Sequence, residues 1–166
     1  MLIKHPVLPL SDQARYLLHC INKFKDPRIP LVITGDFNSV PFSSVYCHIT
    51  GSKPCLREVD ARWFKPCDDP EAGRRIIDID SDSIPHLQSA YLDGAGDEPP
   101  ITNFTPGFYG TLDYIFYDTR SLVCIETREL MSLEEMKSET ALPNTKHGSD
   151  HLTLCATFDF THDGMS

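Results

Sequence analysis

The sequence predicts a single α/β domain, because stretches with helical periodicity alternate with short apolar runs that are typical of buried strands. Residues 11–24 place Leu17, Ile21 and Phe24 on one apolar stripe, which predicts an amphipathic helix behind a Ser or Asp cap. The β-branched run at 31–35 ends at a glycine, as a buried strand does where it enters a loop. A length of 166 residues suits one compact domain.

The rest of the chain shows weaker local signals. They predict a helix over 43–50 that stops at Gly51, strands over 112–117 and 121–130, a helix over 132–139 that opens with a Ser-x-x-Glu capping box, and a final strand over 151–160. Residues 52–110 are mostly irregular and rich in Pro, Gly, Asp and Ser, with a hint of a helix start at 86–91. We therefore expect functional loops in this stretch and a loop insertion near 65–85.

The charge balance is acidic, with 15 Lys and Arg against 24 Asp and Glu and a formal net charge of -9. Such a chain lacks the broad positive field that drives non-specific nucleic-acid binding, which argues against a repair nuclease that grips long duplex DNA. Any phosphate group that it handles is therefore expected to meet a metal ion. No apolar run has the length of a membrane span, and Lys4 and Pro6 interrupt any secretory leader, so we expect a cytoplasmic or nuclear protein with no membrane partner.

The chain has six cysteines, and no two have the Cys-x-x-Cys spacing of a redox or zinc motif. Because Cys20, Cys124 and Cys155 stand in apolar stretches, we interpret them as reduced thiols in the core. A zinc site is the alternative, although its spacing would match no zinc template. Its ligands would be Cys47, His48, Cys55 and Cys67.

Acidic and amide side chains end or begin the predicted strands in three short segments, GDFN (35–38), TLDYIF (111–116) and SDH (149–151). In an open α/β sheet such strand ends converge on one crevice, so we expect these groups to share a site. Oxygen ligands suit a hard cation such as Mg²⁺, and a histidine can neutralise charge that builds on a scissile phosphate. The three segments together favour phosphoryl chemistry.

Each segment also has an interpretation without a catalytic role. Asp36 and Asn38 could shape the turn after a strand, and Asp150 with His151 could be a surface pair where a strand starts. Asp113 is harder to explain in this way, because a half-buried carboxylate needs a partner. The occurrence of all three segments in this order favours a catalytic site.

These segments lie in longer blocks, GDFNSVP (35–41), SAYLDGAGDEPPITNFTPGFYGTLDYIFY (89–117) and LPNTKHGSDHLTLCATF (142–158). With them the chain resembles the endonuclease/exonuclease/phosphatase superfamily, and within it the Ccr4-type poly(A) deadenylases with their nocturnin and Angel relatives. The resemblance implies a four-layer α/β sandwich. Residues 1–166 would be a partial domain, the C-terminal half of that sandwich.

The resemblance also implies a role for each matching residue of the site. Asp36 matches the aspartate that binds metal or activates the attacking water, and Asn38 matches an amide that orients the substrate. Asp113 matches the aspartate that holds the catalytic histidine, His151, which contacts the scissile phosphate. Asp150 matches the carboxylate close to the metals. The implied metal ligands are thus Asp36 and Asp150, and the implied cofactor is Mg²⁺ or Mn²⁺.

Two further residues are assigned to substrate binding by the resemblance. Phe108 matches an aromatic that stacks an adenine base, and Asn103 lies in the same block as a substrate-binding amide. Stacking accepts any base, so a preference for adenine has to come partly from polar contacts nearby. A loop aromatic folded onto the core is the alternative interpretation of Phe108.

The function implied by the resemblance is Mg²⁺-dependent 3′ to 5′ removal of poly(A) from mRNA by hydrolysis that releases AMP. The implied partners are poly(A) RNA and, more weakly, a deadenylase complex. Two alternatives stay open. One is another phosphoesterase of the superfamily, such as a nocturnin-like phosphatase acting on a dinucleotide, and the other is a non-catalytic interaction fragment.

The chain departs from the family pattern at its N-terminal end. The opening strand, the glutamate that anchors the metal and the strand with the N-T-H-L type histidine have no counterpart in residues 1–10, and His5 does not substitute for them. We therefore expect either a fragment of a longer product or a truncated and inactive relative, with one sheet face left uncovered.

Overall fold

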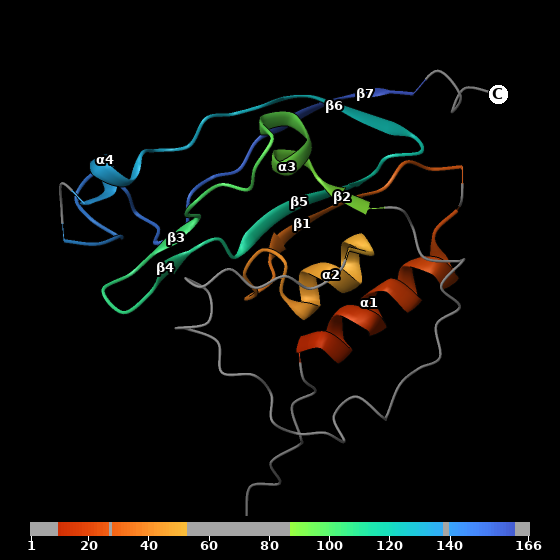
Figure 1. Ribbon diagram of the computed structural model, residues 1–166, viewed down its shortest axis with the longest axis horizontal. Helices are drawn as coiled ribbons and strands as arrows, with labels where there is room; N and C mark the ends of the chain where they lie inside the picture. Colours follow the sequence, from red (N-terminus) through yellow and green to blue (C-terminus); the bar gives the residue numbers. More distant parts are fainter. Residues whose placement is uncertain (1–9, 27, 53–86, 138–139, 162–166) are drawn as a thin grey trace, which may run out of the picture.

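The computed structural model describes residues 10–26, 28–52, 87–137 and 140–161 (Figure 1). Its elements in chain order are α1 (Leu10–Phe24), β1 (Val32–Asp36), α2 (Ser44–Thr50), β2 (Leu87–Ser89), α3 (Ala90–Ala95), β3 (Asn103–Phe104), β4 (Tyr109–Gly110), β5 (Asp113–Asp118), β6 (Leu122–Thr127), α4 (Leu133–Lys137) and β7 (Ala156–Phe160). The predicted α/β class is confirmed.

β5 is the centre of the fold. It pairs antiparallel with β1 on one side and with β2 on the other. Its side chains alternate, so that Tyr114 and Phe116 pack with α1 and α2, whereas Ile115 and Tyr117 pack with α3, β6 and β7. Figure 1 shows the same layers, with α1 and α2 on one side of the sheet and α3 with the β6–β7 pair on the other. One strand therefore contributes to two cores.

The two helices α1 and α2 confirm the predictions for 11–24 and 43–50. On α1 the buried residues are Ala14 and Leu18, whereas Leu17 and Ile21 of the predicted stripe are half-buried. The helix α2 ends at Gly51, whose φ of 69° is the left-handed conformation that glycine adopts without strain. The end of the predicted stripe is wrong, because Phe24 is 74% exposed. Its ring lies under the ammonium group of Lys23, 5.2 Å from the ring centroid. Helical periodicity marks the face but not how far the core extends along it.

The C-terminal strands are shorter than predicted. β6 covers part of 121–130, and β7 begins only at Ala156, because residues 151–155 contribute a single bridge between His151 and Asn103. The register of β6 and β7 shifts between Cys124 and Glu126. Apolar residues alternate along 151–160 and end at Phe160, which predicts that Phe160 faces inward, but it is 60% exposed.

The helix α4 begins behind the predicted capping box. The amide and hydroxyl of Ser132 donate to the carboxylate of Glu135 at 2.9 and 2.8 Å, and the Glu135 amide donates back to the Ser132 hydroxyl at 3.2 Å. Met136 of this helix packs with Phe104 of β3 and with Leu142 in a third cluster. This cluster supports the β3–β4 hairpin beside the site.

The expectation of an irregular chain over 52–110 is wrong for its second part. Residues 87–89 form β2, a strand that was not predicted, and α3 starts at Ala90, within the range 86–91 where the sequence hinted at a helix start. The two strands of the β3–β4 hairpin have two residues each, too short to show an alternating pattern. The expected insertion near 65–85 lies outside the described residues.

The burial of the cysteines differs from the prediction that Cys20, Cys124 and Cys155 are core thiols. Cys47 is buried, Cys20 and Cys124 are half-buried, and Cys155 is exposed. All four are free thiols. Two members of the alternative zinc site, Cys55 and Cys67, lie outside the described residues.

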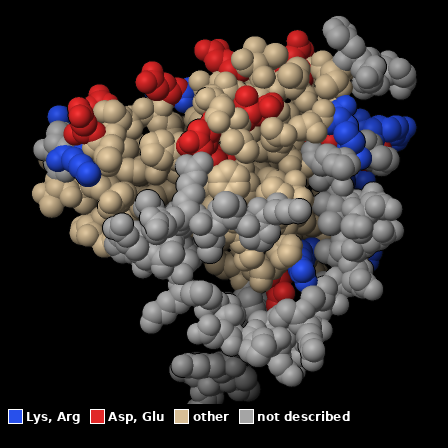
Figure 2. Space-filling model, in the orientation of Figure 1, with Lys and Arg blue, Asp and Glu red and all other residues tan. Residues whose placement is uncertain are grey.

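Acidic side chains are conspicuous on the surface. On the face shown in Figure 2 they gather over the part of the molecule that holds α3, β6 and β7, and basic side chains lie at its margins. This distribution agrees with the net charge of -9. Among the described residues, no helix is both long and apolar enough to cross a membrane.

Candidate active site

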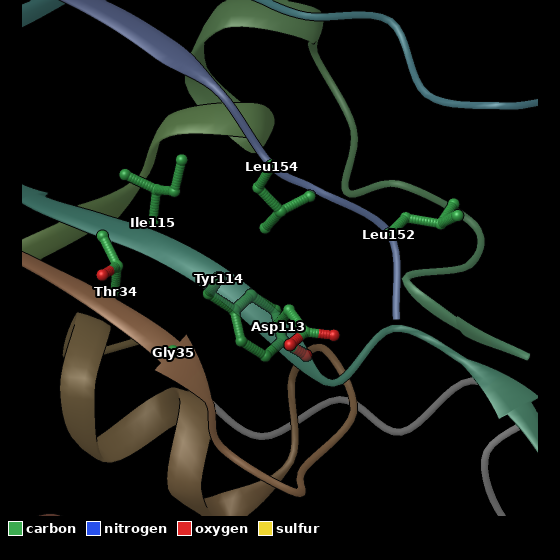
Figure 3. A pocket seen from close by; sticks show the side chains of 7 residues that line it. All are labelled: Thr34, Gly35, Asp113, Tyr114, Ile115, Leu152 and Leu154. Atoms are coloured by element: carbon green, nitrogen blue, oxygen red, sulfur yellow. The ribbon is translucent and has the colours of Figure 1, made fainter. Parts of the chain in front are cut away.

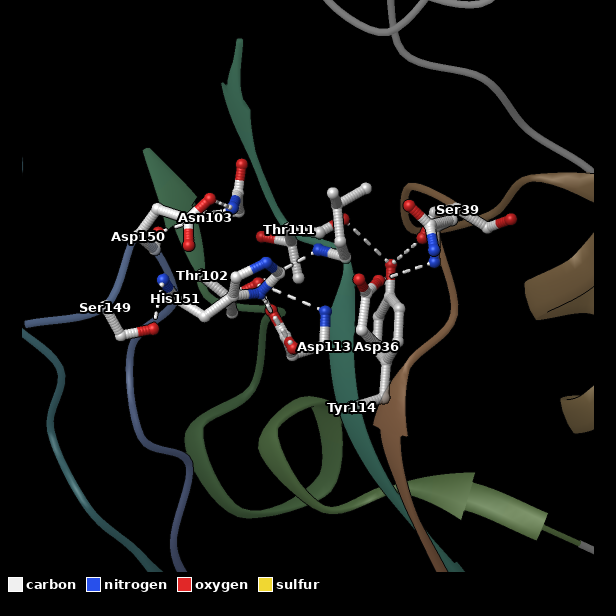
Figure 4. Close-up of polar contacts among 12 residues, drawn as sticks. Asp36, Ser39, Thr102, Asn103, Thr111, Asp113, Tyr114, Ser149, Asp150 and His151 are labelled. Carbon is white, nitrogen blue, oxygen red and sulfur yellow. Dashed lines mark hydrogen bonds and ion pairs between the residues drawn. The ribbon is translucent and has the colours of Figure 1, made fainter. Parts of the chain in front are cut away.

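The candidate site lies where β1 ends and β5 begins (Figure 4). Asp36 and Asp113 are paired in the antiparallel register. Just beyond them the Phe37 amide donates to the Leu112 carbonyl at 2.8 Å. Facing residues of an antiparallel pair project from the same side of the sheet. The two strand ends therefore bring both carboxylates to one edge.

Asp113 and His151 point toward each other across the site. Nδ1 of His151 lies 2.9 Å from Oδ2 and 3.1 Å from Oδ1 of Asp113. The Asp113 side chain is 16% exposed and that of His151 31% exposed. The carboxylate is thus largely removed from water, while the ring is reachable from outside. This arrangement leaves Nε2 available for a substrate oxygen.

The charges around His151 favour its protonated form. Burial alone would lower the pKa of His151, but the hydrogen bond with Asp113 and the charge of Asp113, joined by the charges of Asp36 and Asp150, raise it. A protonated imidazole can donate a hydrogen bond to a phosphoryl oxygen as negative charge builds on it.

Thr102 is a site residue that the sequence reasoning missed. Its hydroxyl donates to Oδ2 of Asp113 at 2.7 Å, and its side chain is fully buried. It lies between Ile101 and Asn103 in a stretch without periodicity. Its position next to the assigned residue Asn103 was a signal in the sequence, and it was too weak to single Thr102 out.

The side chain of Asn103 contacts Asp150. Nδ2 of Asn103 lies 3.3 Å from both the side-chain Oδ2 and the main-chain oxygen of Asp150. The backbone joins the same segments, since the Phe104 amide donates to the Asp150 carbonyl at 2.9 Å and the Leu152 amide donates to the Thr102 carbonyl at 2.7 Å. A ladder therefore positions the SDH segment against residues 102–104.

Ser149 completes the turn into His151, and the sequence reasoning did not assign it a role. Its hydroxyl accepts a hydrogen bond from the His151 amide at 3.0 Å. A serine hydroxyl that binds the amide two residues onward is a known turn motif. Ser149 thus shapes the backbone that presents the histidine.

Asn38 stands in the turn after β1. Its φ is 47°, in the left-handed region that Asn tolerates better than most residues, and its amide donates to Oδ1 of Asp36 at 2.7 Å. The Ser39 carbonyl behind it accepts a hydrogen bond of 2.7 Å from the Tyr114 hydroxyl. The backbone of Asn38 thus forms the turn after β1, and its main-chain amide holds the Asp36 carboxylate.

Phe108 lies at the tip of the β3–β4 hairpin and is half-buried. Its amide donates to the Thr105 hydroxyl at 3.1 Å, and its carbonyl accepts from the Thr105 amide at 2.7 Å. A Cβ added at Gly110 would lie 3.0 Å from the Phe108 ring. The Phe108 ring therefore lies against Gly110. It is neither packed into the core nor fully exposed.

A pocket of about 270 Å³ opens beside Asp113 (Figure 3). Thr34 and Gly35 of β1 line it, as do residues 113–115 of β5 and two leucines of the segment that leads to β7, Leu152 and Leu154. Its volume is just below the roughly 300 Å³ of the smallest typical ligand sites. Within the described residues the pocket thus has room for a small ligand or for part of a larger one.

The donors of the site fit a hard divalent cation in kind. Carboxylate oxygens of Asp36 and Asp150 are the ligands that Mg²⁺ prefers. The two residues flank the Asp113–His151 pair in Figure 4, on opposite sides. In the described ranges, no group of three or more His, Cys, Asp or Glu side chains is arranged to hold a metal ion. These residues therefore offer oxygen ligands without enclosing a cation.

Residues 2–151 match the model of the Endonuclease/Exonuclease/phosphatase family. The chain belongs to this family, whose relatives are hydrolytic nucleases and phosphoesterases.

Curated relatives carry several related names. The chain is 36% identical over 148 residues to 2′,5′-phosphodiesterase 12 of Rattus norvegicus. This match covers 87% of the chain and 22% of the rat protein. It is 33% identical over 142 residues to Carbon catabolite repressor protein 4 homolog 1 of Arabidopsis thaliana, with 78% and 24% covered. The chain thus spans about a quarter or less of the length of these relatives.

Solved structures show the same fold. The human Nocturnin catalytic domain with bound sulfate has a TM-score of 0.56 and 29% sequence identity, and the match covers 92% of this chain and 41% of that one. ANGEL2, a 2′,3′-cyclic phosphatase in complex with adenosine-2′,3′-vanadate, has a TM-score of 0.62 and 22% identity, with 93% and 54% covered. The predicted fold class, the α/β sandwich of this family, is therefore confirmed. The chain matches about half of each solved chain.

Proposed function

We propose that the chain carries part of a metal-dependent 3′ to 5′ exoribonuclease site of the Ccr4 type, which removes poly(A) from mRNA. The observation that carries the proposal is the Asp113–His151 pair, 2.9 Å apart, at a sheet edge where Asp36 and Asp150 flank it. Relatives named as Ccr4 homologues and as the exoribonuclease subunit of the CCR4-Not complex support an RNA substrate.

The chain's own residues would act on the scissile phosphate as follows. Asp113 holds the His151 ring, and Nε2 of that ring donates a hydrogen bond to a non-bridging oxygen as charge builds in the transition state. Asp36 and Asp150 would hold Mg²⁺ or Mn²⁺, which supplies polarisation of the phosphate and a more acidic water when bound. The pocket lined by the β1–β5 pair and by Leu152 and Leu154 would accept the group next to the scissile bond.

A second candidate is hydrolysis of 2′,5′-phosphodiester bonds. It is favoured by the 36% identity to 2′,5′-phosphodiesterase 12, a relative that shares the same segment of chain. The proposed residues would be the same, because the two linkages differ in which ribose oxygen leaves. The third candidate is removal of phosphate from a dinucleotide, by analogy with the nocturnin-like alternative. A phosphorylated dinucleotide is therefore included in the test.

The test is a substrate panel with the purified chain, in Mg²⁺, Mn²⁺ or EDTA. The substrates are a 5′-labelled RNA with a 3′ poly(A) tail, the same RNA without the tail, a 2′,5′-linked oligoadenylate and a phosphorylated dinucleotide. Variants His151→Ala and Asp150→Ala are compared with two controls, Glu129→Gln and His19→Ala, which change a surface carboxylate and a histidine on α1.

Each outcome of the panel decides between the candidates. Metal-dependent release of AMP from the tail, lost in the two site variants and kept in the two controls, supports the proposal. Preferential cleavage of the 2′,5′-linked substrate would replace it with the second candidate, and phosphate release from the dinucleotide with the third. No hydrolysis of any substrate with either metal overturns a catalytic function for this chain and favours the interaction fragment.

The cellular setting is proposed on the same basis. A deadenylase acts on mRNA in the cytoplasm or the nucleus, and a deadenylase complex would be its partner, as the relative named as a subunit of the CCR4-Not complex suggests. Co-purification of the tagged chain with poly(A) RNA and with scaffold proteins of such a complex tests this part.

A further inference from the structure

The hydroxyl of Thr102 makes three hydrogen bonds inside the protein. It donates to Oδ2 of Asp113 at 2.7 Å and accepts from the amides of Leu112 at 2.9 Å and of Asp113 at 3.1 Å. The side chain is fully buried, so water does not compete for these positions. A threonine hydroxyl has one donor and two acceptor sites, and all three are used here.

The polarity of this arrangement follows from its two backbone partners. A backbone N–H can only donate, so the Leu112 and Asp113 amides occupy both lone pairs of the hydroxyl. The one proton of the hydroxyl is then directed to Oδ2 of Asp113. Asp113 therefore acts as an acceptor toward Thr102, and donated hydrogen bonds favour the ionised form of a carboxylate.

The same oxygen faces His151. Oδ2 of Asp113 lies 2.9 Å from Nδ1 of the ring, and an ionised carboxylate can only accept. The hydrogen-bond network thus assigns the proton to Nδ1. The ring cannot turn over without losing this contact, so Nε2 stays directed to the open side of the site.

We propose that Thr102 is a positioning residue, whose buried hydroxyl fixes the Asp113 carboxylate and thereby sets the orientation of the His151 ring, with Nδ1–H directed to Oδ2 of Asp113. The consequence for hydrolysis rests on the proposed function, whereas the assignment of the ring proton does not. Thr102 touches neither substrate nor metal in this scheme and acts through Asp113.

The backbone hydrogen bonds of Thr102 allow the role of its side chain to be tested separately from its role in the fold. Its amide donates to the Gly110 carbonyl at 2.9 Å, and its carbonyl accepts from the Leu152 amide at 2.7 Å. A substitution of the side chain leaves both bonds possible. Loss of the hydroxyl therefore removes the contact with Asp113 while the segments that carry it stay joined.

The experiment compares ring ¹⁵N chemical shifts and the Nδ1–H proton resonance of His151 in the wild-type chain and in three variants. Thr102→Val removes the hydroxyl at nearly constant volume, and Thr102→Ser retains it. Thr111→Val is the matched control, because the Thr111 hydroxyl is also buried and donates to the main-chain oxygen of Pro99, away from Asp113. Initial rates are measured on the substrate that the wild type hydrolyses.

The expected wild-type signature is a protonated Nδ1 with a downfield proton, kept in Thr102→Ser and Thr111→Val and weakened in Thr102→Val. We expect kcat to fall about 10- to 100-fold in Thr102→Val with KM unchanged, as for loss of an outer partner of a catalytic group. Thr102→Ser restores most of the rate.

Three results would overturn the inference. The first is a neutral wild-type ring with its proton on Nε2, a result that needs no variant and holds even if Thr102→Val does not fold. The second is an unchanged signature and rate in Thr102→Val, and the third is loss of the signature in a folded Thr102→Ser. If the wild type hydrolyses no substrate, the proposed function fails, and the ring signatures still decide the role of Thr102.

Discussion

The hydroxyl of Tyr46 donates a hydrogen bond of 2.7 Å to the carboxylate of Glu98, which joins α2 to the segment that leads into Thr102. Both side chains are buried. Burial raises the pKa of Tyr46, and the charge and hydrogen bond of Glu98 raise it further. The tyrosine therefore stays a neutral donor at any physiological pH, and the contact couples one face of the sheet to the site.

Replacing Tyr46 by Phe removes a donor to this buried carboxylate. We expect Tyr46→Phe to lower the free energy of unfolding by about 1.5 to 3 kcal/mol, the range for hydrogen bonds to charged groups. The midpoint of urea denaturation measures the change. Tyr16→Phe is the control, because Tyr16 lies on α1 and is largely exposed. Equal midpoints for the wild type and Tyr46→Phe would contradict this prediction.

Two aspartates with the same local geometry differ in burial. Asp26 and Asp118 each accept two hydrogen bonds from the guanidinium group of the arginine two residues onward, Arg28 or Arg120. The Asp118 side chain is 3% exposed, whereas that of Asp26 is 34% exposed. Burial alone would raise the pKa of Asp118, but the hydrogen bonds and charge of Arg120 lower it below its usual value.

The lowered pKa of Asp118 gives the pH dependence its sign. The stabilisation is complete above the unfolded-state pKa of about 3.9 and is lost as pH falls through the lower folded-state pKa. We expect Asp118→Asn to be less stable than the wild type at pH 6, by about 1 kcal/mol, and the two unfolding free energies to converge as the pH falls through the folded-state pKa of Asp118. Asp26→Asn, the matched control, should change little throughout. A difference that grows with acidity would refute the sign.

Asp36 faces Asp113 across the β1–β5 pair, so two like charges project from one side of the sheet. Without metal, we expect Asp36→Asn to raise the free energy of unfolding by about 0.5 kcal/mol at low salt, because like charges on facing residues are destabilising. Urea denaturation in EDTA at pH 8 measures this, and added salt reduces the gain. Asp159→Asn is the control, because Asp159 faces the apolar Val123. Loss of stability in Asp36→Asn would contradict the argument.

The Phe108 ring tests the proposed base contact. If it stacks a base, Phe108→Ala raises KM for the RNA substrate by about 5- to 150-fold, the equivalent of 1 to 3 kcal/mol per stacked base, and leaves kcat nearly unchanged. Gly110→Ala pushes the same ring aside, because the new methyl group would lie 3.0 Å from it, so we expect a smaller rise. Steady-state kinetics measure both, with Phe24→Ala as the exposed aromatic control. An unchanged KM in Phe108→Ala removes the stacking role.

The strand ends of the site could be predicted from the sequence because polar groups interrupt apolar runs there. The run over 31–35 ends next to Asp36, and Asp113 opens the run that forms β5. The capping box of α4 could also be predicted from the sequence, because its two partners are three residues apart. The pairing of Asp113 with His151 came from the family resemblance, because 38 residues separate them and no local pattern connects them.

Thr102, β2 and the exposure of Phe160 could not be predicted in the same way. The contact of Thr102 with Asp113 forms only in the folded chain, and β2 has three residues, too few for an alternating pattern. Alternation indicated which face of β7 turns inward, but it contains no information on whether another layer covers Phe160. Tertiary contacts decide all three, and local patterns report only part of them.

The backbone ladder between residues 102–104 and 150–152 has a consequence for turnover. Since it ties the histidine segment to the hairpin, and Thr102 ties the hairpin to the start of β5, no catalytic segment moves by itself. The entropy of ordering these groups is lost once, when the chain folds, and not again at each encounter with a substrate. The relative positions of these segments are therefore set when the chain folds, and binding of a ligand need not bring them together.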